Sequence, residues 1–521
     1  MLNCSVILDG SAQSVAELTA VVMGEDRWTY DRLNRAACQF AGGLVRAGVE
    51  KGDRIVLACP NRVEFIVAFF GILKCGASVV PVSILSKRRE IAFVMEDTQA
   101  TGMVCFEGSE TLSLGKEGRT AFDETESCRL FWWIARDSSE QTVGGMPTLY
   151  SAMEGVLESF PSVLTEPTDI AVILYTSGTT GKPKGAVLSH QNIFTTALTA
   201  GRLSNMNQKD VSLVTLPLFH CYAQTVQMNA GLYYGSSMVL LERFDPDLVL
   251  QAMQDHNVTL FCGVPTMYWA LLNHEGSENY DLEKIASNLR LGCSGGAPIP
   301  VEVIRGVEEK YQFQILEGYG LSETSAMATF NQSHRPRKIG SVGLPVWGVE
   351  IQVVDDDMNP MPTGERGEVV IRGHSVMQGY FNRPDLTEEV FRDGWFHTGD
   401  VGQLDEDGYL YIVDRTKDMI IRGGFNVYPR EIEEVLATHP EVSLSAVIGV
   451  PHEKYGEEVM AFTILKEGAT VTEEQIVVWS KQEMASYKYP RVVKIVEALP
   501  LGATGKVLKK ELRVQLERGE V

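Results

Sequence analysis

The residues best suited to chemistry stand in one segment, YTSGTTGKPKG, at positions 175–185. It follows an apolar run, Ile170–Leu174, that is typical of a buried strand. Glycines let the backbone turn and present its N–H groups, hydroxyls donate to phosphate oxygens, and lysines supply positive charge. The segment is not a Walker loop, because Thr176 replaces the first glycine and Pro183 follows the lysine. A surface turn of small residues is the alternative, but the position directly after a strand favours phosphate binding.

Four later segments also combine glycine with groups that could bind a ligand. They are GGAP at 295–298, EGYGLSET at 317–324, WFHTGD at 395–400 and PLGATGK at 500–506. Taken alone, each has an ordinary alternative: a strand-to-helix turn, a solvated loop carboxylate, a Gly-Asp turn and a surface lysine. The second nearly matches G-x-G-x-x-G, but Glu323 stands where the last glycine belongs, which argues against a dinucleotide fingerprint.

Together and in this order, these motifs resemble those of the acyl-adenylate-forming enzymes. That family includes acyl-CoA synthetases, plant coumarate–CoA ligases, firefly luciferase and the adenylation domains of peptide synthetases. The resemblance extends from about Trp28 to Lys506, which is nearly the whole chain. It implies an ATP-dependent carboxylic acid–CoA ligase that forms an acyl-AMP, releases pyrophosphate and passes the acyl group to coenzyme A. The partners it implies are the acid, ATP, Mg²⁺ and coenzyme A.

The resemblance also assigns nucleotide-binding roles. In the family's pattern Tyr319 stacks on adenine and Ser322 bonds a phosphate oxygen. Asp400 can accept both ribose hydroxyls, and Arg415 makes a second ribose contact. Glu323 helps to hold Mg²⁺, a hard cation that prefers carboxylate and phosphate oxygens. The nucleotide-binding residues implied are Thr176, Ser177, Gly178, Thr179, Thr180, Gly181, Lys182, Gly296, Ala297, Pro298, Glu317, Gly318, Tyr319, Gly320, Ser322, Asp400 and Arg415.

Lys506 occupies the position of the family's catalytic lysine. Attack of a carboxylate on the α-phosphate joins two anions, and a positioned ammonium can bridge both. Lys417 matches the family's hinge, about which the C-terminal domain is expected to rotate. That rotation withdraws Lys506 and brings Gly423 and Gly424 towards the CoA thiol. A plain strand turn is the alternative for the two glycines.

The substrate is harder to predict. The segment PLFHCYA at 217–223 lacks the aspartate that pairs with an amino group in peptide synthetases, so an amino acid is disfavoured. His220 is expected to orient the carboxylate or gate the acyl pocket and joins Lys506 and Glu323 in the catalytic set; a core histidine is the alternative. Small and apolar pocket walls suit an aliphatic or aryl tail and favour a medium- or long-chain fatty acid. The walls expected besides His220 are Val264, Met267, Ala326, Met327 and Val342.

Three rival functions stay in view. The acyl group could pass to the phosphopantetheine of a carrier protein, although no obvious insertion hampers CoA use between Gly343 and Asp400. A catalytically silent nucleotide-binding protein would be expected to lack Lys506, Glu323 or the hydroxyl loop, and all are present. Luciferase-like oxidation needs an unusual substrate that a sequence does not reveal.

The elements that must position these residues alternate in type, which predicts α/β layers around largely parallel sheets. From Gly348 onwards, short alternating runs separated by turns indicate a β-rich subdomain. A new α/β unit begins near Lys417, so we predict domains at 1–416 and 417–521, the second small and mobile. The strands expected are Arg54–Cys59, Ser78–Val82, Ile170–Tyr175, Met238–Leu241, Leu260–Gly263, Arg290–Ser294, Glu350–Val354, Gly367–Arg372, Gly408–Val413 and Leu444–Gly449; the helices are Val63–Cys75, Tyr428–His439 and Thr472–Glu483.

Composition narrows the functional class. The 521 residues are 44% apolar and 22% charged, which is typical of globular protein, and exceed one ordinary core. The net charge of −22 disfavours nucleic acid as a partner. Met1–Gly10 lacks a basic leader, and the longest apolar run, Ile66–Leu73, is too short to span a bilayer. Nine scattered cysteines without a C-x-x-C pair suggest a reducing cytoplasm. Peripheral membrane contact and a homodimer are left open.

Overall fold

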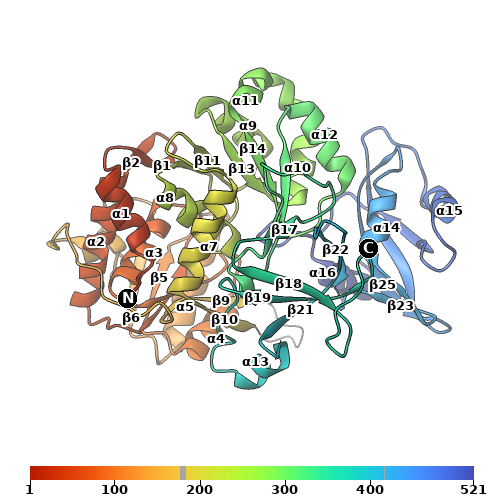
Figure 1. Cartoon of the computed structure of the whole chain (residues 1–521). Helices are drawn as coiled ribbons and strands as arrows, with labels where there is room; N and C mark the ends of the chain where they lie inside the picture. Colours follow the sequence, from red (N-terminus) through yellow and green to blue (C-terminus); the bar gives the residue numbers. More distant parts are fainter. Residues whose placement is uncertain (177–182, 416, 521) are drawn as a thin grey trace.

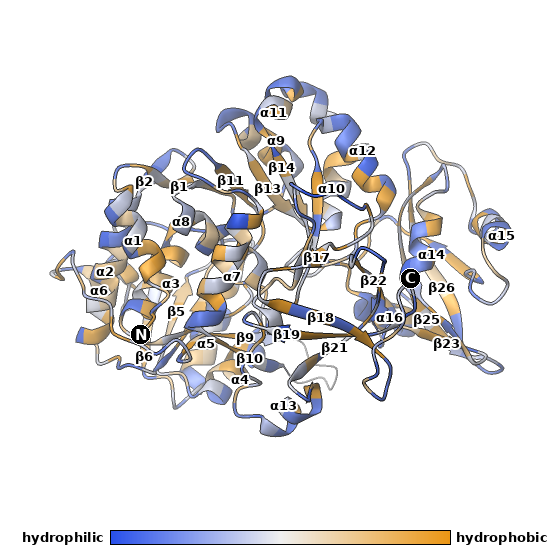
Figure 2. Cartoon of the chain, viewed as in Figure 1, coloured by the Kyte–Doolittle hydropathy of each residue, from blue (hydrophilic) through white to orange (hydrophobic). Residues whose placement is uncertain are grey.

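The computed structural model describes residues 1–176, 183–415 and 417–520 (Figure 1). Two large sheets with helices on their faces make up most of the N-terminal part. A five-stranded antiparallel sheet follows, and a separate sheet with its own helices forms the C-terminal part. The predicted α/β class, with its β-rich region and smaller C-terminal unit, is therefore confirmed. Figure 2 shows apolar colour concentrated in the strands and in the helices between the large sheets.

The larger sheet has nine strands, and the run from β15 to β1 is entirely parallel. Its parallel strands end at one edge, where ligand-binding loops of α/β folds gather. The strands predicted at 238–241, 260–263 and 290–294 all belong to it, displaced by at most one residue. In spatial order the strands are β17 (Leu344–Pro345), β16 (Thr329–Phe330), β15 (Ile315–Tyr319), β14 (Leu291–Ser294), β13 (Leu260–Gly263), β11 (Val211–Val214), β12 (Ser237–Leu240), β1 (Thr19–Met23) and β2 (Asp26–Thr29).

The second sheet has six strands and is parallel except at one end, where β10 runs antiparallel to β9. In that pair Thr176 lies opposite Lys184, so the two strands bracket the hydroxyl-rich loop. The strands in order are β10 (Lys184–Ser189), β9 (Ile170–Thr176), β4 (Ser78–Pro81), β3 (Arg54–Ala58), β5 (Gly102–Phe106) and β6 (Leu130–Ile134). A small hairpin, β7 (Thr142–Val143) and β8 (Met146–Pro147), stands apart.

Helices fill three layers around these sheets (Figure 1). Between the sheets lie α3 (Val63–Lys74), α7 (His190–Leu203), the π-helix η1 (Tyr222–Asn229) and α8 (Ala230–Tyr234), with α1 (Val6–Ser14) packed on α8 and α2 (Tyr30–Arg46) on α3. The outer face of the larger sheet is covered by α9 (Pro246–Asp255), α10 (Pro265–Leu272), α11 (Leu282–Asn288) and α12 (Val301–Tyr311), with the 3₁₀ turn η2 (Glu275–Asn279) beside α9. The smaller sheet carries α4 (Arg88–Thr98), α5 (Leu114–Glu124) and α6 (Leu149–Met153).

The helix α3 explains why the interior of this part is so apolar. Every residue of α3 is buried, as expected of a helix enclosed by other layers. The predicted helix at 63–75 ends one residue earlier than expected. Its last residue, Lys74, is fully buried and forms an ion pair with Asp9 of α1. Across the ranges that the structure describes, no helix combines the length and apolarity needed to cross a membrane.

The remaining chain forms two further sheets that meet at the predicted domain boundary. The β-rich sheet contains β18 (Val349–Val354), β19 (Gly367–Gly373), β20 (Phe391–Arg392), β21 (Trp395–Leu404) and β22 (Leu410–Arg415), with α13 (Pro384–Val390) beside β20. The C-terminal sheet contains β23 (Ile420–Arg422), β24 (Phe425–Val427), β25 (Val442–His452), β26 (Gly456–Leu465) and β27 (Val492–Ile495), with α14 (Pro429–Leu436), α15 (Glu473–Glu483) and α16 (Lys509–Arg518). Sheet membership thus changes between Arg415 and Ile420.

Four predicted elements begin one or two residues later than expected, and for two of them the local reason is clear. The strand expected from Gly408 begins at Leu410, because Gly408 has a φ of +81° and belongs to the preceding turn. The helix expected from Tyr428 begins at Pro429, with Tyr428 in extended conformation as its N-cap.

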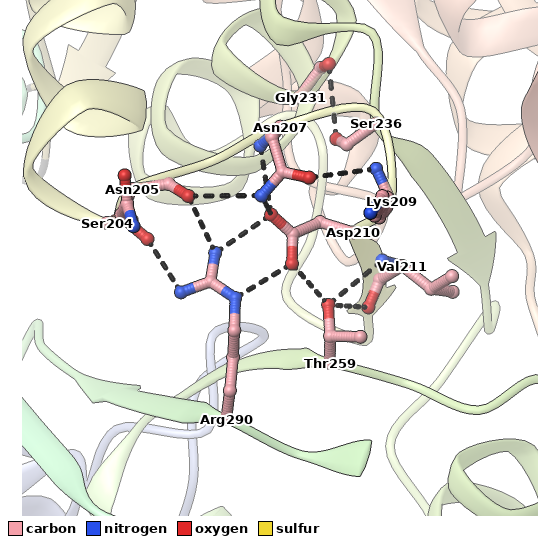
Figure 3. A network of polar contacts seen from close by, with 10 residues as sticks. All are labelled: Ser204, Asn205, Asn207, Lys209, Asp210, Val211, Gly231, Ser236, Thr259 and Arg290. Carbon is pink, nitrogen blue, oxygen red and sulfur yellow. Dashed lines mark hydrogen bonds and ion pairs between the residues drawn. The ribbon is translucent and has the colours of Figure 1, made fainter.

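An ionic network around the buried Asp210 joins the amino ends of three parallel strands (Figure 3). Arg290, just before β14, donates to both carboxylate oxygens of Asp210, just before β11, at 2.8 Å each. Thr259, just before β13, donates to Asp210 at 2.7 Å. Arg290 also donates to the carbonyls of Ser204 and Asn205 at the end of α7. One carboxylate therefore fixes three strands and a helix end on the side of the sheet opposite its carboxyl edge.

We expect Asp210→Ala to lower the free energy of unfolding by about 2 kcal/mol, because it removes the charged acceptor of the hydrogen bonds from Arg290 and Thr259. Burial raises the pKa of Asp210, but hydrogen bonds from Arg290 and Thr259 outweigh it, and the pKa lies below its ordinary value. The stabilisation is therefore present above the ordinary Asp pKa of about 4 and is lost as the pH falls through the lower native value.

Urea unfolding at pH 7 and pH 3 measures this difference. Lys209→Ala is the matched control, because Lys209 is exposed and only its backbone N–H joins the network. Equal unfolding midpoints for Asp210→Ala and Lys209→Ala at pH 7 would rule out the network's stabilising role.

Candidate active site

Lys506 reaches from the C-terminal part into the N-terminal part on a tight hairpin. The Gly502 N–H donates to the Lys506 carbonyl at 2.8 Å, and Gly505 has a φ of +77°. Thr266 Oγ1 donates to the Gly505 carbonyl at 2.5 Å. An ideal Cβ on Gly505 would lie 2.9 Å from a methyl carbon of Val264, so this close approach requires glycine. The hairpin thus anchors Lys506 between the two parts.

Gly296 makes the space that Lys506 occupies. It follows β14 with a φ of +81°, a conformation that glycine tolerates best. An ideal Cβ there would lie 2.8 Å from Lys506 Cε and 3.3 Å from Nζ. Ala297 is half-buried and Pro298 exposed in the same turn, so the turn faces outward beside the lysine. Burial lowers the pKa of the Lys506 ammonium, and the positive charge of Arg415 lowers it further.

His220 lies beside this lysine and is electrically neutral. The Tyr222 N–H donates to its Nδ1 at 3.2 Å, so the neutral ring carries its proton on Nε2. Burial lowers the pKa of His220 to about 3, and the charge of Lys506 acts in the same direction. The Nε2–H can therefore donate to an anion at any physiological pH.

Asp400 is held rigidly by two donors from different strands. Tyr319, the last residue of β15, donates from its hydroxyl to Oδ2 at 2.5 Å. Arg415 lies opposite Asp400 in the β21–β22 pair, and its Nε is 3.0 Å from Oδ1. Asp400 is 2% exposed, and burial raises its pKa more than Arg415 and Tyr319 lower it. Each carboxylate oxygen keeps acceptor capacity for a further hydroxyl.

Glu323 receives two hydrogen bonds on one oxygen. Thr176 at the end of β9 and Tyr380 donate to Oε1 at 3.3 Å and 3.1 Å. Lys184 lies over the Tyr380 ring at 5.0 Å. Among the described residues Glu323 is not part of a cluster of three or more His, Cys, Asp or Glu side chains. Of the predicted phosphate-binding loop, Thr176 is thus placed beside Glu323, whereas Ser177, Gly178, Thr179, Thr180, Gly181 and Lys182 lie outside the described residues.

The predicted acyl-pocket walls are all near the carboxyl edge of the larger sheet. Val264, Met267, Met327 and Val342 are buried in one apolar cluster with Ala328. Of these, Val264 and Met267 lie beside the Lys506 hairpin, with atoms within 4 Å of the ideal Cβ position of Gly505.

The turn after β15 is strained where the sixth predicted wall lies. Ala326 is half-buried and has a φ of +87°, which is uncommon for a residue with a side chain. An ideal Cβ on Gly320 would lie 2.2 Å from the Ala326 carbonyl oxygen, so the two backbones approach closely. Such strain is concentrated at binding sites.

Three other residues of the predicted nucleotide-binding set, Glu317, Gly318 and Ser322, contact other parts of the protein. The carboxylate of Glu317 is turned to the Gly340 N–H at 2.9 Å, and burial raises its pKa to about 7. Gly318 packs against Phe330, and Ser322 lies 3.7 Å from the Cys221 sulfur. The side chain of Glu317 is therefore turned into the protein and is not open to a ligand.

Gly423 and Gly424 are not brought to this cluster. They form the turn between β23 and β24 on the outer side of the C-terminal part (Figure 1). Gly423 donates its N–H to the Tyr455 carbonyl at 2.8 Å, and Gly424 is exposed. Lys417 is exposed in the turn that joins the β-rich sheet to the C-terminal sheet.

Sequence reasoning missed two features of this site. Tyr380 has no signal in the sequence, because it stands 57 positions from the glutamate that it bonds. The π-helix η1 after His220 was also not foreseen; its run of polar residues in a buried position was the only available hint.

Comparison with known proteins agrees with this geometry. Sequence profiles described as AMP-binding enzyme and AMP-binding enzyme C-terminal domain match residues 8–381 and 431–506. Feruloyl-CoA synthase from Amycolatopsis sp is 34% identical over 498 residues, 95% of each chain. Long-chain-fatty-acid–CoA ligase from Bacillus subtilis is 34% identical over 526 residues, 97% of this chain and 93% of that one.

Solved structures agree as well. ATP-bound MatB from Rhodopseudomonas palustris superposes with a TM-score of 0.90 at 33% identity, covering 99% of both chains. The apo form of that protein, at 32% identity and the same coverage, gives 0.79, so the arrangement seen here is nearer to the ATP-bound one. The chain therefore belongs to the family of AMP-binding enzymes, and within that family it is a carboxylic acid–CoA ligase.

Proposed function

We propose that this enzyme activates a medium- or long-chain fatty acid with ATP and transfers the acyl group to coenzyme A. The observation that carries the proposal is the meeting of Lys506 with His220 and the Gly296 turn. Two cationic or donor groups from different parts of the chain converge there on one space, next to a rigid carboxylate, Asp400.

In the first half-reaction a carboxylate oxygen of the acid attacks the α-phosphorus of ATP. The bond to the bridging oxygen breaks, so that pyrophosphate leaves and an acyl-AMP is formed. The Lys506 ammonium can bridge the two anions and stabilise the charge that develops between them. The Nε2–H of His220 orients the carboxylate, and Asp400 with Arg415 holds the ribose.

Mg²⁺ fits this arrangement through Glu323. Both hydrogen bonds described for this carboxylate end on Oε1, and the family's phosphate loop begins at its partner Thr176. One carboxylate together with substrate phosphates is a common Mg²⁺ environment. The ion, held by Glu323 and the ATP phosphates, would supply positive charge at the phosphate oxygens.

In the second half-reaction the CoA thiol attacks the acyl carbonyl carbon. The bond to the AMP oxygen breaks, so a thioester, AMP and a proton are released. This step needs the space that Lys506 fills, and rotation at Lys417 would empty it. The exposed Gly423–Gly424 turn is the element that we propose takes its place beside the thiol.

The acid itself is proposed from the apolar walls Val264, Met267, Met327 and Val342. Transfer of an aryl or acyl group to a carrier-protein phosphopantetheine is the alternative for the second step. Single-turnover transfer rates to CoA and to a loaded carrier protein would separate the two acceptors. A cytoplasmic location also belongs to the proposal, because all nine cysteines are buried and unpaired.

Acid-dependent exchange of labelled pyrophosphate into ATP tests the proposed function. The purified enzyme, with Mg²⁺-ATP, is offered acids from acetate through octanoate and palmitate to cinnamate. We expect exchange with at least one class and the fastest exchange with the fatty acids. If exchange is fastest with cinnamates, the proposed substrate becomes an aryl acid and not a fatty acid. If no acid supports exchange, the ligase proposal is wrong.

We expect Gly296→Ala to reduce adenylation nearly as much as Lys506→Ala, by about a hundredfold or more. A methyl group at Gly296 meets Cε of Lys506 and excludes the ammonium from the site. Thioester formation from preformed acyl-AMP should be affected much less, because Lys506 is withdrawn for that step. Both half-reactions are measured separately by rapid quench.

Gly364→Ala is the matched control for this variant. Gly364 has a φ of +82°, close to that of Gly296, but nothing lies within 4 Å of its ideal Cβ. It therefore carries the same backbone strain, about 1 kcal/mol, without the contact. Equal losses of adenylation in both variants would assign the effect to strain and not to displacement of Lys506.

The adenylation step should depend on pH through Lys506 and not through His220. A lowered pKa means that the ammonium loses its proton below the ordinary lysine range, so kcat/KM for adenylation should fall at alkaline pH sooner than a normal lysine allows. His220, with a pKa of about 3, should add no change between pH 5 and 8. Pyrophosphate exchange measured from pH 5 to 10 shows both the alkaline fall due to Lys506 and the absence of a His220 titration. A change in rate near pH 6.5 that disappears in His220→Gln would contradict the expectation for His220.

A further inference from the structure

The π-helix η1 buries an unusual amount of unpaired polarity. Its side chains from Ala223 to Asn229 are buried. Within the described part of the chain, five buried side-chain atoms of this helix have no hydrogen-bond partner: Gln224 Oε1, Thr225 Oγ1, Gln227 Oε1, and both Asn229 Oδ1 and Nδ2. A buried polar atom that stays unpaired is destabilising, because it has lost its hydrogen bonds to water. Five such atoms on eight residues therefore call for an explanation.

The side-chain amides of Gln224 and Gln227 have fixed orientations, because their Nε2 atoms donate hydrogen bonds. Gln224 Nε2 donates to the Leu218 carbonyl at 3.3 Å. Gln227 Nε2 donates to Ser212 Oγ at 3.2 Å and to the Leu213 carbonyl at 2.9 Å. These bonds fix the amide planes and leave the two Oε1 atoms as oriented acceptors. Asn229 keeps both a donor and an acceptor to offer.

The outer end of η1 lies in the active site. Tyr222, its first residue, places its ring 3.2 Å from the ideal Cβ position of Gly295 and donates its hydroxyl to the Cys293 carbonyl at 3.3 Å. His220 stands two positions earlier, and its Nδ1 accepts the Tyr222 N–H. The helix therefore starts where the reacting carboxylate is proposed to lie and leads inward from it.

The inner part of η1 adjoins the proposed acyl-pocket walls. Gln227 bonds to β11 at Leu213, and Thr215 at the end of the same strand donates to the sulfur of the wall residue Met267 at 3.7 Å. On the other side η1 packs on α7, where Thr196 Oγ1 is buried and likewise without a partner in the described residues. The helix thus packs on β11, the strand that leads to the contact of Thr215 with Met267, and on α7.

We propose that η1 is the polar side of the acyl pocket, and that the physiological acid carries a neutral hydrogen-bonding group, such as a hydroxyl, carbonyl or amide, on its chain or ring. The inference rests on the proposed function and narrows its substrate. Gln224 and Gln227 would accept from a donor on the acid, while Thr225 and Asn229 can pair with either a donor or an acceptor. π-helical turns occur frequently at functional sites, which agrees with this use.

The group must be uncharged. In the described structure the hydrogen bonds of the η1 amides run to backbone carbonyls and to the Ser212 hydroxyl, all neutral. A second carboxylate or an ammonium buried there would lack a counterion, which strongly disfavours binding. Residues 224 to 229 follow His220 by four to nine positions, which puts the group on the chain or ring of the acid, away from its carboxyl carbon.

Paired acids test this inference. Decanoate is compared with decanoates that carry one hydroxyl or oxo group at carbons 5 to 10, and cinnamate with 4-hydroxycinnamate, by kcat/KM for pyrophosphate release. We expect the wild-type enzyme to favour at least one oxygenated acid over its plain counterpart by about tenfold or more, since only that acid pairs the buried atoms.

Two variants tie the preference to η1. Asn229→Leu and the nearly isosteric Thr225→Val should reduce the oxygenated-to-plain ratio towards one, mainly by lowering kcat/KM for the oxygenated acid. Ser480→Ala is the control, since Ser480 carries a buried hydroxyl without a partner in the described structure, but on α15 of the C-terminal part. It should leave the ratio unchanged.

The failures can be told apart. Plain acids turned over as fast as every oxygenated partner would overturn the inference and leave the proposed function standing. If both variants keep the wild-type preference for an oxygenated acid, η1 is not the element that recognises the oxygenated group. Turnover of no acid at all would defeat the proposed function and this inference together.

Discussion

The contact on which the site depends is the seating of one lysine against one glycine across the two parts of the chain. Lys506 comes from the last hundred residues and Gly296 from the end of a central strand, and the lysine fits only where the glycine has no side chain. The hydrogen bond from Thr266 to the Gly505 carbonyl and the close approach of Gly505 to Val264 fix the same junction from the other side. Movement of the C-terminal part therefore carries the ammonium with it.

The rest of the fold serves to bring distant segments to that junction. Parallel strands β13, β14 and β15 end there, so the segments after β13 and β14 and the last residue of β15 bring Val264, Gly296 and Tyr319 to one edge. At the opposite edge the Asp210–Arg290 network, with Thr259, ties together the starts of β11, β13 and β14. The β-rich sheet adds Asp400 and Arg415 as neighbours in one ladder, which explains why two residues fifteen positions apart act as a pair.

Much of this was predictable because it follows local rules. Apolar runs of four to six residues identified six strands of the two large sheets to within one residue, since buried parallel strands are continuously apolar. The inner strands β5, β11 and β15 were not predicted. The ordered motifs brought Lys506, Asp400 and Glu323 forward, and the family assignment that they implied is confirmed. Periodicity says nothing about hydrogen bonds between residues far apart in sequence, so the bond from Tyr380 to Glu323 was beyond reach. Nor does it distinguish a π-helix from an α-helix, because the two differ by one residue per hydrogen-bonded turn.

The sequence also left side-chain direction undecided. Glu317 and Tyr319 belong to the same motif, yet the carboxylate of Glu317 is buried against Gly340, whereas the hydroxyl of Tyr319 reaches Asp400. Gly423 and Gly424 were expected near the thiol, and their distance from Lys506 reflects a single arrangement of a chain that is proposed to use two. Which arrangement a sequence adopts depends on interface free energies that no motif records.

The carboxylate of Asp400 already has one donor on each oxygen before any nucleotide arrives. Its rotation is thereby frozen during folding, and a single acceptor direction remains on each side. A vicinal diol can fill both directions at once, whereas a sugar with one hydroxyl would leave a buried anion incompletely solvated. With Asp400 as the proposed ribose contact, the same two donors that stiffen the strand pair would let the site distinguish ribonucleotides from deoxyribonucleotides.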